Sequence, residues 1–350
     1  MSASAVIGVV GNDVPRLLPL AAAAVPMRLT GSWDGPVDPA AQELLGASDL
    51  ETVRILTELR AGAVHVDALV VCNDTQAHLR LFYVLRVTAP HLPLQLLDLP
   101  RADSAPARAF ARGRLMRLLE FCEQVSGCRA SAADFAAAAE AERTLGAAID
   151  RLRRARRSDP PDCTGATAID ALLQAGRLPP EEAVAVVDAA CAPVERDAAS
   201  PPRRRVHLTG SNHPDPSVYR TLEEHDLVIV SEDHDTGDGA RIGVADGTDT
   251  DVDAIIDALV GAHFSRTGGS ATALSAERAS ETVRQAVEAG AEAVGAFIRE
   301  LDDAPRWDLA DQDRALADVG MTLQVRTGVG ADPLPAAAEL AAALRGRGDR

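Results

Sequence analysis

The sequence has few aromatic residues and no excess of positive charge. Phe, Trp and Tyr make up only 3% of the 350 residues, so alanine and aliphatic side chains must fill most of the interior. The formal net charge is −17. Non-specific nucleic-acid binding requires a lysine- and arginine-rich surface, and anionic membrane surfaces also attract basic segments. The charge balance therefore argues against a nucleic-acid or membrane partner.

Cysteines are few, and their spacing forms no familiar pattern. There is no C-x-x-C pair among the five, which are Cys72, Cys122, Cys128, Cys163 and Cys191. The odd number and the spacing argue against a disulfide framework and against a zinc ribbon. We therefore expect reduced thiols, as in a cytoplasmic protein.

Long apolar runs and common catalytic signatures are also missing. No stretch approaches the roughly 20 apolar residues that a membrane-spanning helix needs. The opening MSASAVIGVVGND has a short apolar run without a basic flank, which is not typical of a signal peptide. Walker, zincin and Ser-His-Asp motifs are absent, so no such motif identifies the chemistry.

The sequence does contain short β-branched runs that alternate with helical patterns. Strand candidates begin at residues 6, 25, 68 and 92, and again at residues 206, 227, 293 and 321. This alternation is typical of βαβ units and parallel sheets. The pattern predicts an α/β fold in which two Rossmann-like or flavodoxin-like lobes with parallel sheets are joined by a helical middle segment.

Three regions follow from this pattern. The chain is helical from residue 105 to about 157, and one predicted buried face contains Leu115, Leu118, Leu119 and Cys122. A second helical pair precedes the linker-like stretch DAASPPRRR. We therefore predict an N-terminal α/β lobe (1–103), a helical middle and linker (104–200), and a C-terminal α/β lobe (201–350).

One helix of the N-terminal lobe has marked ends. Ser48 is predicted as its N-cap, Glu51 completes a capping box with it, and Gly62 ends the helix.

Two strand-end segments are the best candidates for a site. They are ALVVCNDTQ, from Ala68, and VIVSEDHDTG, from Val228. Ligands of open parallel sheets bind outside the carboxyl ends of the strands. The two segments hold equivalent places in the two lobes, so they could face each other across a cleft.

The second segment also suggests a metal site. Asp233, His234 and Asp235 are consecutive, and His213 lies on the neighbouring strand-end loop. Carboxylate and imidazole groups suit a divalent metal, but at most two of three consecutive side chains could reach one ion. The alternative is an acidic turn that caps the next element and faces water.

Cys72 ends a predicted buried strand. It could be a nucleophile or a metal ligand, with His78 on the following helix, or a buried structural cysteine.

Four stretches also occur in a characteristic order. They are VVGNDVPRLLPLAAAAVPMRLTG, DALVVCNDTQAHLRLFYVLR, LQLLDLPR and VHLTGSNHPDPSVYRTLEEHDLVIVSEDHDTG. Together they resemble the 2-hydroxyacyl-CoA dehydratase / benzoyl-CoA reductase family over roughly residues 5–330. The second is similar to a family segment that ends in His-Thr-Cys-Asp, and the fourth to a block that ends in Asp-Leu-Cys-Thr-Gly.

The resemblance implies a cubane iron–sulfur cluster held by three cysteine thiolates, and an ATP-dependent activator that supplies an electron. In an alignment without gaps, Thr75 and Gln76 stand where the first motif has Cys-Asp. Asp235 stands at the cysteine of the second motif. The remaining cysteine would lie near Ala47 or Ser48, so all three expected thiolates are missing.

The resemblance also implies a set of substrate-cleft residues. They are Asp74, Thr75, Gln76, Asp235, Thr236 and Gly237.

Three interpretations remain open. The first is a dehydratase-family subunit that has lost its own cluster, pairs with a family homologue and shapes an acyl-CoA cleft in a lyase-type complex. The second is a stand-alone non-redox lyase that reuses the cleft, with a divalent metal. The third is a non-catalytic binding or scaffold protein. We expect the first.

Overall fold

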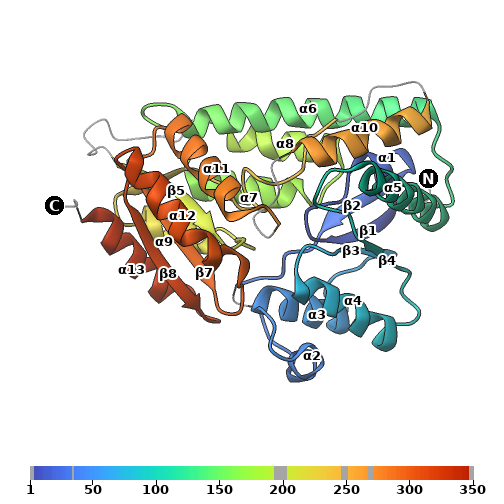
Figure 1. Ribbon diagram of the computed structural model, residues 1–350, viewed down its shortest axis with the longest axis horizontal. Helices are drawn as coiled ribbons and strands as arrows, with labels where there is room; N and C mark the ends of the chain where they lie inside the picture. Colours follow the sequence, from blue (N-terminus) through green and yellow to red (C-terminus); the bar gives the residue numbers. More distant parts are fainter. Residues whose placement is uncertain (1–3, 34, 193–202, 246–250, 267–271, 347–350) are drawn as a thin grey trace.

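The structure is a computed structural model, and it describes residues 4–33, 35–192, 203–245, 251–266 and 272–346. Two four-stranded sheets, in which all neighbouring strands are parallel, form two lobes that lie side by side (Figure 1). This arrangement confirms the predicted α/β fold class.

The N-terminal sheet has the order β2 (Ala24–Arg28), β1 (Ala5–Val10), β3 (Ala68–Cys72) and β4 (Leu94–Leu97). Every residue of β3 is buried, as expected for a strand covered on both faces. One face packs against α1 (Leu17–Ala21) and α5 (Ala105–Ser126). The other face packs against α2 (Pro39–Leu45), α3 (Leu50–Ala61) and α4 (Gln76–Thr88).

The C-terminal sheet has the order β6 (Leu227–Glu232), β5 (Arg204–Gly210), β7 (Ala293–Arg299) and β8 (Leu323–Val329). One face packs against α7 (Gly165–Ala175), α9 (Ser217–Glu223) and α13 (Leu334–Arg345). The other packs against α11 (Ser275–Glu288) and α12 (Ala304–Asp318).

Helices of the middle region connect the lobes. The long helix α6 (Ala132–Arg157) places Phe135 in the N-terminal core and Ile149 in a helical core with α7 and α8 (Pro180–Ala190). Its last turn brings Arg156 to the end of β6. Figure 1 shows α6 running alongside both lobes.

One helix of the C-terminal part of the sequence packs on the N-terminal lobe. This helix is α10 (Val252–Ser265), and its Ile256 and Leu259 belong to the same core as α1 and α5. The chain therefore crosses between the lobes again after β6. The three predicted domain ranges stay predictions, and the boundary at residues 200 and 201 lies outside the described residues.

The start of α3 differs from the predicted cap. Asp49, not Ser48, is the N-cap, and its carboxylate accepts hydrogen bonds from the main-chain N–H groups of Glu51 and Thr52. Glu51 instead forms an ion pair with Arg299 of the other lobe. A sequence pattern cannot show that competing partner, because 248 positions separate the two residues. Gly62 ends the helix with φ 65°, as predicted.

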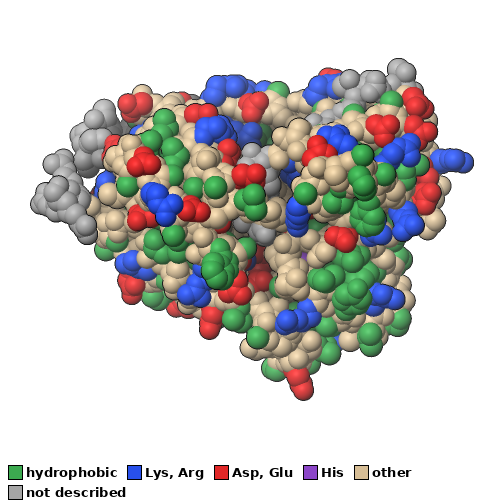
Figure 2. All heavy atoms as spheres, viewed as in Figure 1, with side chains coloured by type: hydrophobic (Ala, Val, Ile, Leu, Met, Phe, Trp, Pro, Cys, Tyr) green, Lys and Arg blue, Asp and Glu red, His purple; other side chains and the backbone are tan. Residues whose placement is uncertain are grey.

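No described helix is both long and apolar enough to cross a membrane. In the space-filling view, acidic and basic side chains are interspersed over the described part of the visible face (Figure 2).

Candidate functional site

A large cavity lies between the lobes. It has a volume of about 580 Å³ and is bounded by the ends of β1 and β6 and by α6, α10 and α11. Its charged lining is balanced, with six arginines and six carboxylates among the described residues. The arginines are Arg153, Arg157, Arg241, Arg266, Arg278 and Arg284. The carboxylates are Asp150, Asp233, Asp235, Asp238, Glu281 and Glu288.

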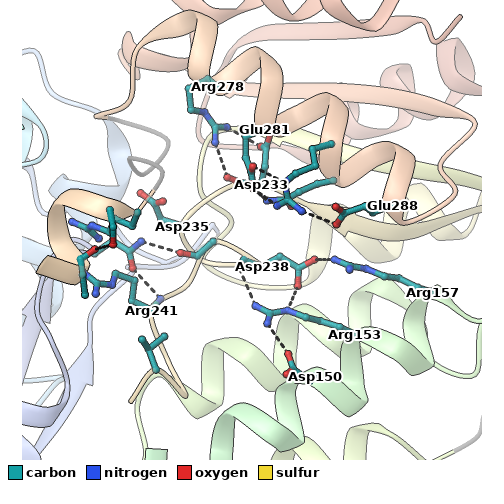
Figure 3. A pocket seen from close by; sticks show the side chains of 18 residues that line it. Asp150, Arg153, Arg157, Asp233, Asp235, Asp238, Arg241, Arg278, Glu281 and Glu288 are labelled. Atoms are coloured by element: carbon teal, nitrogen blue, oxygen red, sulfur yellow. Dashed lines mark hydrogen bonds and ion pairs between the residues drawn. The ribbon is translucent and has the colours of Figure 1, made fainter. Parts of the chain in front are cut away.

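The loop that follows β6 forms one wall of this cavity. Asp238 accepts hydrogen bonds from Arg153, Arg156 and Arg157 of α6, at 2.9, 2.6 and 2.8 Å. Figure 3 shows Asp238 between Arg153 and Arg157 (Figure 3). Burial disfavours the charged carboxylate, but the three guanidinium groups outweigh burial and hold the pKa of Asp238 well below its usual range. The helix α6 therefore fixes the loop electrostatically.

Gly237 allows the same loop to turn tightly. A Cβ atom at this position would overlap the side chain of Glu232. Glu232 is itself buried, and Arg156 donates a 2.7 Å hydrogen bond to it. Gly237, one of the predicted site residues, is therefore needed for the conformation of the loop.

Asp233 points away from its two neighbours and into an ion pair. Arg278 of α11 lies 2.9 Å from its carboxylate, and Thr282 donates a hydrogen bond to it. Although burial raises the pKa of a carboxyl, Arg278 and His207 hold the pKa of Asp233 well below its usual range. Asp233 is therefore a charged partner of α11.

His234 points in another direction, into the C-terminal lobe. Its Nε2 atom lies 2.8 Å from the Tyr219 hydroxyl and its Nδ1 atom 3.0 Å from the Thr236 hydroxyl. Burial lowers the pKa of His234 to about 3, so the ring is neutral at pH 7. Both ring nitrogens already have partners within the protein.

The rings of His213 and His234 lie close together. Their ring centroids are 5.0 Å apart, and Trp33, Tyr219 and Phe297 surround the His213 ring. His213 is fully buried, and neither ring nitrogen has a hydrogen-bond partner. Burial lowers its pKa well below 6.5. The two histidines therefore lie in an aromatic core, where they are neutral.

Asp235 also lines the cavity. It is 6% exposed, and its main-chain N–H donates to the Asn212 side chain at 3.0 Å. The guanidinium of Arg28, at the end of β2, donates to its main-chain oxygen. Thr236 accepts a 2.9 Å hydrogen bond from the main chain of His213. These contacts hold the β6 loop against both lobes.

The strand-end segment after β3 lies on the opposite lobe. Asp74 accepts a 3.1 Å hydrogen bond from the main-chain N–H of Asn12 and lies 2.5 Å from His78. Burial by itself would lower the pKa of His78, but Asp74 and two nearby carboxylates raise it to about 9. Thr75 caps α4 by accepting from the His78 N–H, and Gln76 is exposed.

None of the described residues that line the large cavity comes from α4. Two sets of contacts nevertheless connect the strand-end segment after β3 with the loop that follows β6. Asn12, which bonds to Asp74, also donates to the main-chain oxygen of Gly239 at 3.0 Å. Arg28 joins Asn12 to Asp235. That Thr75 and Asp235 face each other stays a prediction.

Sequence reasoning missed three polar residues that connect the lobes. They are Asn12, Arg28 and Arg299. One signal was available, because Asn-Asp follows β1 and β3 alike and Asn212 follows β5. Three strand ends with asparagine indicate a common polar edge.

The sequence suggested two kinds of cofactor, a divalent metal and an iron–sulfur cluster. No group of three or more described His, Cys, Asp or Glu side chains is placed to hold a metal ion. Burial raises the pKa of Cys72 well above its usual value, and its side chain lies in the N-terminal core. Its neighbour His78 pairs with Asp74 instead. Asp233, His234 and His213 have the separate surroundings described above.

An iron–sulfur cluster with three thiolates does not fit these residues either. At the three positions that the resemblance indicated, Thr75 caps a helix, Asp235 is a carboxylate, and Ser48 has a buried hydroxyl without a hydrogen-bond partner. None of the five cysteines forms a group of three possible ligands with other residues of the described part of the chain.

A family model described as 2-hydroxyglutaryl-CoA dehydratase, D-component, matches residues 12–295. No curated protein matches the chain.

Proposed function

The chain belongs to the 2-hydroxyglutaryl-CoA dehydratase D-component family, and from this membership we propose that it is one subunit of an acyl-CoA dehydratase-type complex. We further propose that it carries no iron–sulfur cluster of its own. In this proposal its interlobe cavity is the acyl-CoA site, and the complex works in the cytoplasm.

The observation that carries the proposal is the cavity at the strand ends. Its volume of about 580 Å³ falls in the usual range for small-molecule sites. Coenzyme A carries several phosphate charges, and guanidinium groups bind phosphate through paired hydrogen bonds. Arg284 is a suitable contact, because it lines the cavity from α11 and is half exposed, and its ion pairs with Glu281 and Glu288 hold it there.

The absence of a cluster is proposed on the chemistry of the ligand positions. Carboxylate and hydroxyl groups are poor ligands for iron–sulfur clusters, which thiolates hold. The residues of this chain would then bind and orient the substrate. A partner subunit with its own cluster would supply electron transfer.

A partner is proposed because the family description names a component of an enzyme. We infer a family homologue as that partner, in a homo- or hetero-oligomer.

Acyl-CoA binding to the isolated full-length chain tests the proposal. Pentanoyl-CoA should bind saturably in isothermal titration calorimetry, and Arg284→Gln should weaken binding about three- to tenfold. Arg143→Gln is the matched control, since Arg143 lies on the exposed face of α6 in an ion pair with Glu140. The proposal fails if pentanoyl-CoA does not bind, or if the two variants lower affinity equally.

A further inference from the structure

Helices of both lobes form one face of the molecule, on either side of the large cavity. The cavity is lined by α10 on the N-terminal lobe and by α11 on the C-terminal lobe. Helix α5 packs beside α10, and α12 packs beside α11. Figure 1 shows α5 and α12 in the foreground of the two lobes, and hydrophobic side chains are visible on both lobes in the same view (Figure 2). Surfaces on α5 and α12 are therefore placed to meet one and the same partner.

The beginnings of α11 and α12 expose large apolar side chains. Trp307 is 80% exposed and Leu274 is 71% exposed. The two are neighbours, because the hydroxyl of Ser275 lies 3.5 Å from the main-chain oxygen of Trp307. Leu301, which precedes α12, is half exposed. These three apolar residues form the tryptophan patch. Tryptophan is usually well buried and is enriched among the residues that dominate binding at protein interfaces, so this patch favours a protein partner.

Leu301 is held in an unfavourable backbone conformation. Its φ is 63°, in the left-handed region that residues other than glycine seldom adopt. The residues on both sides are fixed, because Arg299 pairs with Glu51 and the Ser211 hydroxyl donates a 2.6 Å hydrogen bond to Asp302. Such a conformation persists only where the surrounding structure imposes it. The exposed leucine is therefore a fixed part of the tryptophan patch.

Helix α5 carries a second exposed surface, the α5 patch, which consists of Phe110, Gly113 and Arg117. Phe110 is half exposed. Gly113 and Arg117 are also exposed, and they lie on the same side of the helix because they follow Phe110 at helical spacing. A Cβ atom at Gly113 would have no neighbour within 4 Å. The surface beside Phe110 is therefore open and has room for a large aromatic ring.

The two patches differ in the charge of their surroundings. From Ala105 to Leu119, α5 contains four arginines and no acidic residue. Two of these arginines pair with exposed carboxylates, whereas Arg117 forms no ion pair with another described residue. Around the tryptophan patch, carboxylates outnumber arginines. The carboxylates are Glu277, Glu300, Asp303 and Asp311, and the arginines are Arg306 and Arg314. The two patches are therefore complementary in charge.

We propose that this face is the interface of a homodimer, in which the tryptophan patch of each copy packs against the α5 patch of the other. About a twofold axis this contact occurs twice. The alternative, in which like patches meet, would bring the acidic surroundings of the two tryptophans together. The inference goes beyond the proposed function and does not rest on acyl-CoA binding, and the proposed cluster-bearing subunit would be a separate partner.

Sedimentation equilibrium of the full-length protein measures the dimer dissociation constant. The wild type should form dimers at micromolar concentration. Trp307→Ala should weaken the dimer about 30-fold for each contact and about 1,000-fold in all, because a central aromatic anchor is lost twice. Val87→Ala is the matched control and should dimerise like the wild type. Val87 is also 80% exposed, but it lies on α4, which covers the opposite face of the N-terminal sheet.

Three results of this experiment would overturn the homodimer. They are a monomeric wild type, an unchanged dissociation constant in Trp307→Ala, and equal effects of Trp307→Ala and Val87→Ala. A monomeric wild type that binds pentanoyl-CoA would overturn the homodimer and leave the proposed function standing.

A mixture of two variants shows which patches meet. Phe110→Ala should weaken the dimer as Trp307→Ala does. In a mixed dimer of the two variants, one contact joins two intact patches and the other contact carries both substitutions. Residues in contact lose less together than the sum of their separate losses, so the mixed dimer should be about threefold or more tighter than the dimer of either variant alone. A mixed dimer that is no tighter would contradict the pairing of unlike patches.

Arg117→Glu tests the charge complementarity. It should weaken the dimer about three- to tenfold in about 50 mM salt and less in about 500 mM salt, where exposed charges are screened. Arg143→Glu makes the same change on the exposed face of α6 and should leave the dissociation constant unchanged. Equal effects of the two variants would contradict the opposite charge of the patches, on which the choice of a second copy as the partner depends.

Discussion

At the residue scale, the β6 loop depends on a glycine and on neutral histidines. Gly237 is needed because a Cβ atom would overlap Glu232, which is buried and paired with Arg156. His213 and His234 are buried in their neutral forms. Both features lead to specific predictions about the free energy of unfolding.

Gly237→Ala should lower the free energy of unfolding by about 1–3 kcal/mol, because the new methyl group must displace Glu232. Gly113→Ala is the matched control. Gly113 is exposed in α5 with no neighbour within 4 Å of a Cβ, so the same change should stabilise by about 0.5–1 kcal/mol. Chemical denaturation of both variants measures the difference, and equal effects would contradict the steric argument.

The buried histidines should make the protein less stable in acid. Their folded pKa values lie below 6.5, so the unfolded chain binds more protons below pH 6.5 and stability falls as the pH falls. In His213→Phe, the loss of stability between pH 7 and pH 5 should be smaller than in the wild type by about 2 kcal/mol. An unchanged loss would show that His213 is not held neutral.

His78 provides a control of opposite sign. Its pKa is raised to about 9, so its contribution is complete below pH 6.5 and is lost as the pH rises through 9. Denaturation of His78→Gln should therefore differ from the wild type in pH dependence between pH 7 and 9. Between pH 5 and 6 the two dependences should match.

At the scale of elements, α10 shows which interactions hold this helix against the N-terminal lobe, after the chain has crossed from the other lobe. Ile256 is fully buried in the N-terminal core. Arg112 of α5 pairs with Asp253 and Asp257, but all three side chains are more than a third exposed. Apolar burial should therefore outweigh the ion pairs.

Ile256→Ala should cost about 2–5 kcal/mol, whereas Arg112→Gln should cost at most about 1 kcal/mol. Denaturant unfolding of the two variants measures both changes. A larger effect from Arg112→Gln would mean that exposed ion pairs hold α10 in place.

The strands could be predicted from the sequence, and the position of α10 could not. All eight predicted strands are present, because short apolar runs that alternate with helical patterns leave a clear local signal. The apolar face of α10 is equally clear, but its pattern does not say which sheet it covers. The predicted capping box of α3 was wrong, because Asp49 is the N-cap and Glu51 bonds to a distant residue, Arg299.

At the scale of the whole molecule, polar and aromatic contacts between the lobes position the cavity. Arg299 pairs with Glu51 at 2.6 Å, and Trp33 of the N-terminal lobe packs against Phe297 of the other. Family resemblance placed Asp235, Thr236 and Gly237 near a site, and the structure places all three on the β6 loop, where Asp235 lines the cavity. Arg28 had no comparable motif, because its contacts join residues of both lobes.

The central claim is that this family member keeps the cleft and has no cluster of its own. Iron and acid-labile sulfide, measured together with the visible spectrum on full-length protein purified without oxygen, test it most directly. We predict a colourless protein with far less than one iron and one sulfide per chain. A brown protein with about four of each would contradict the claim, because the cluster would then have ligands other than three cysteine thiolates at the expected positions.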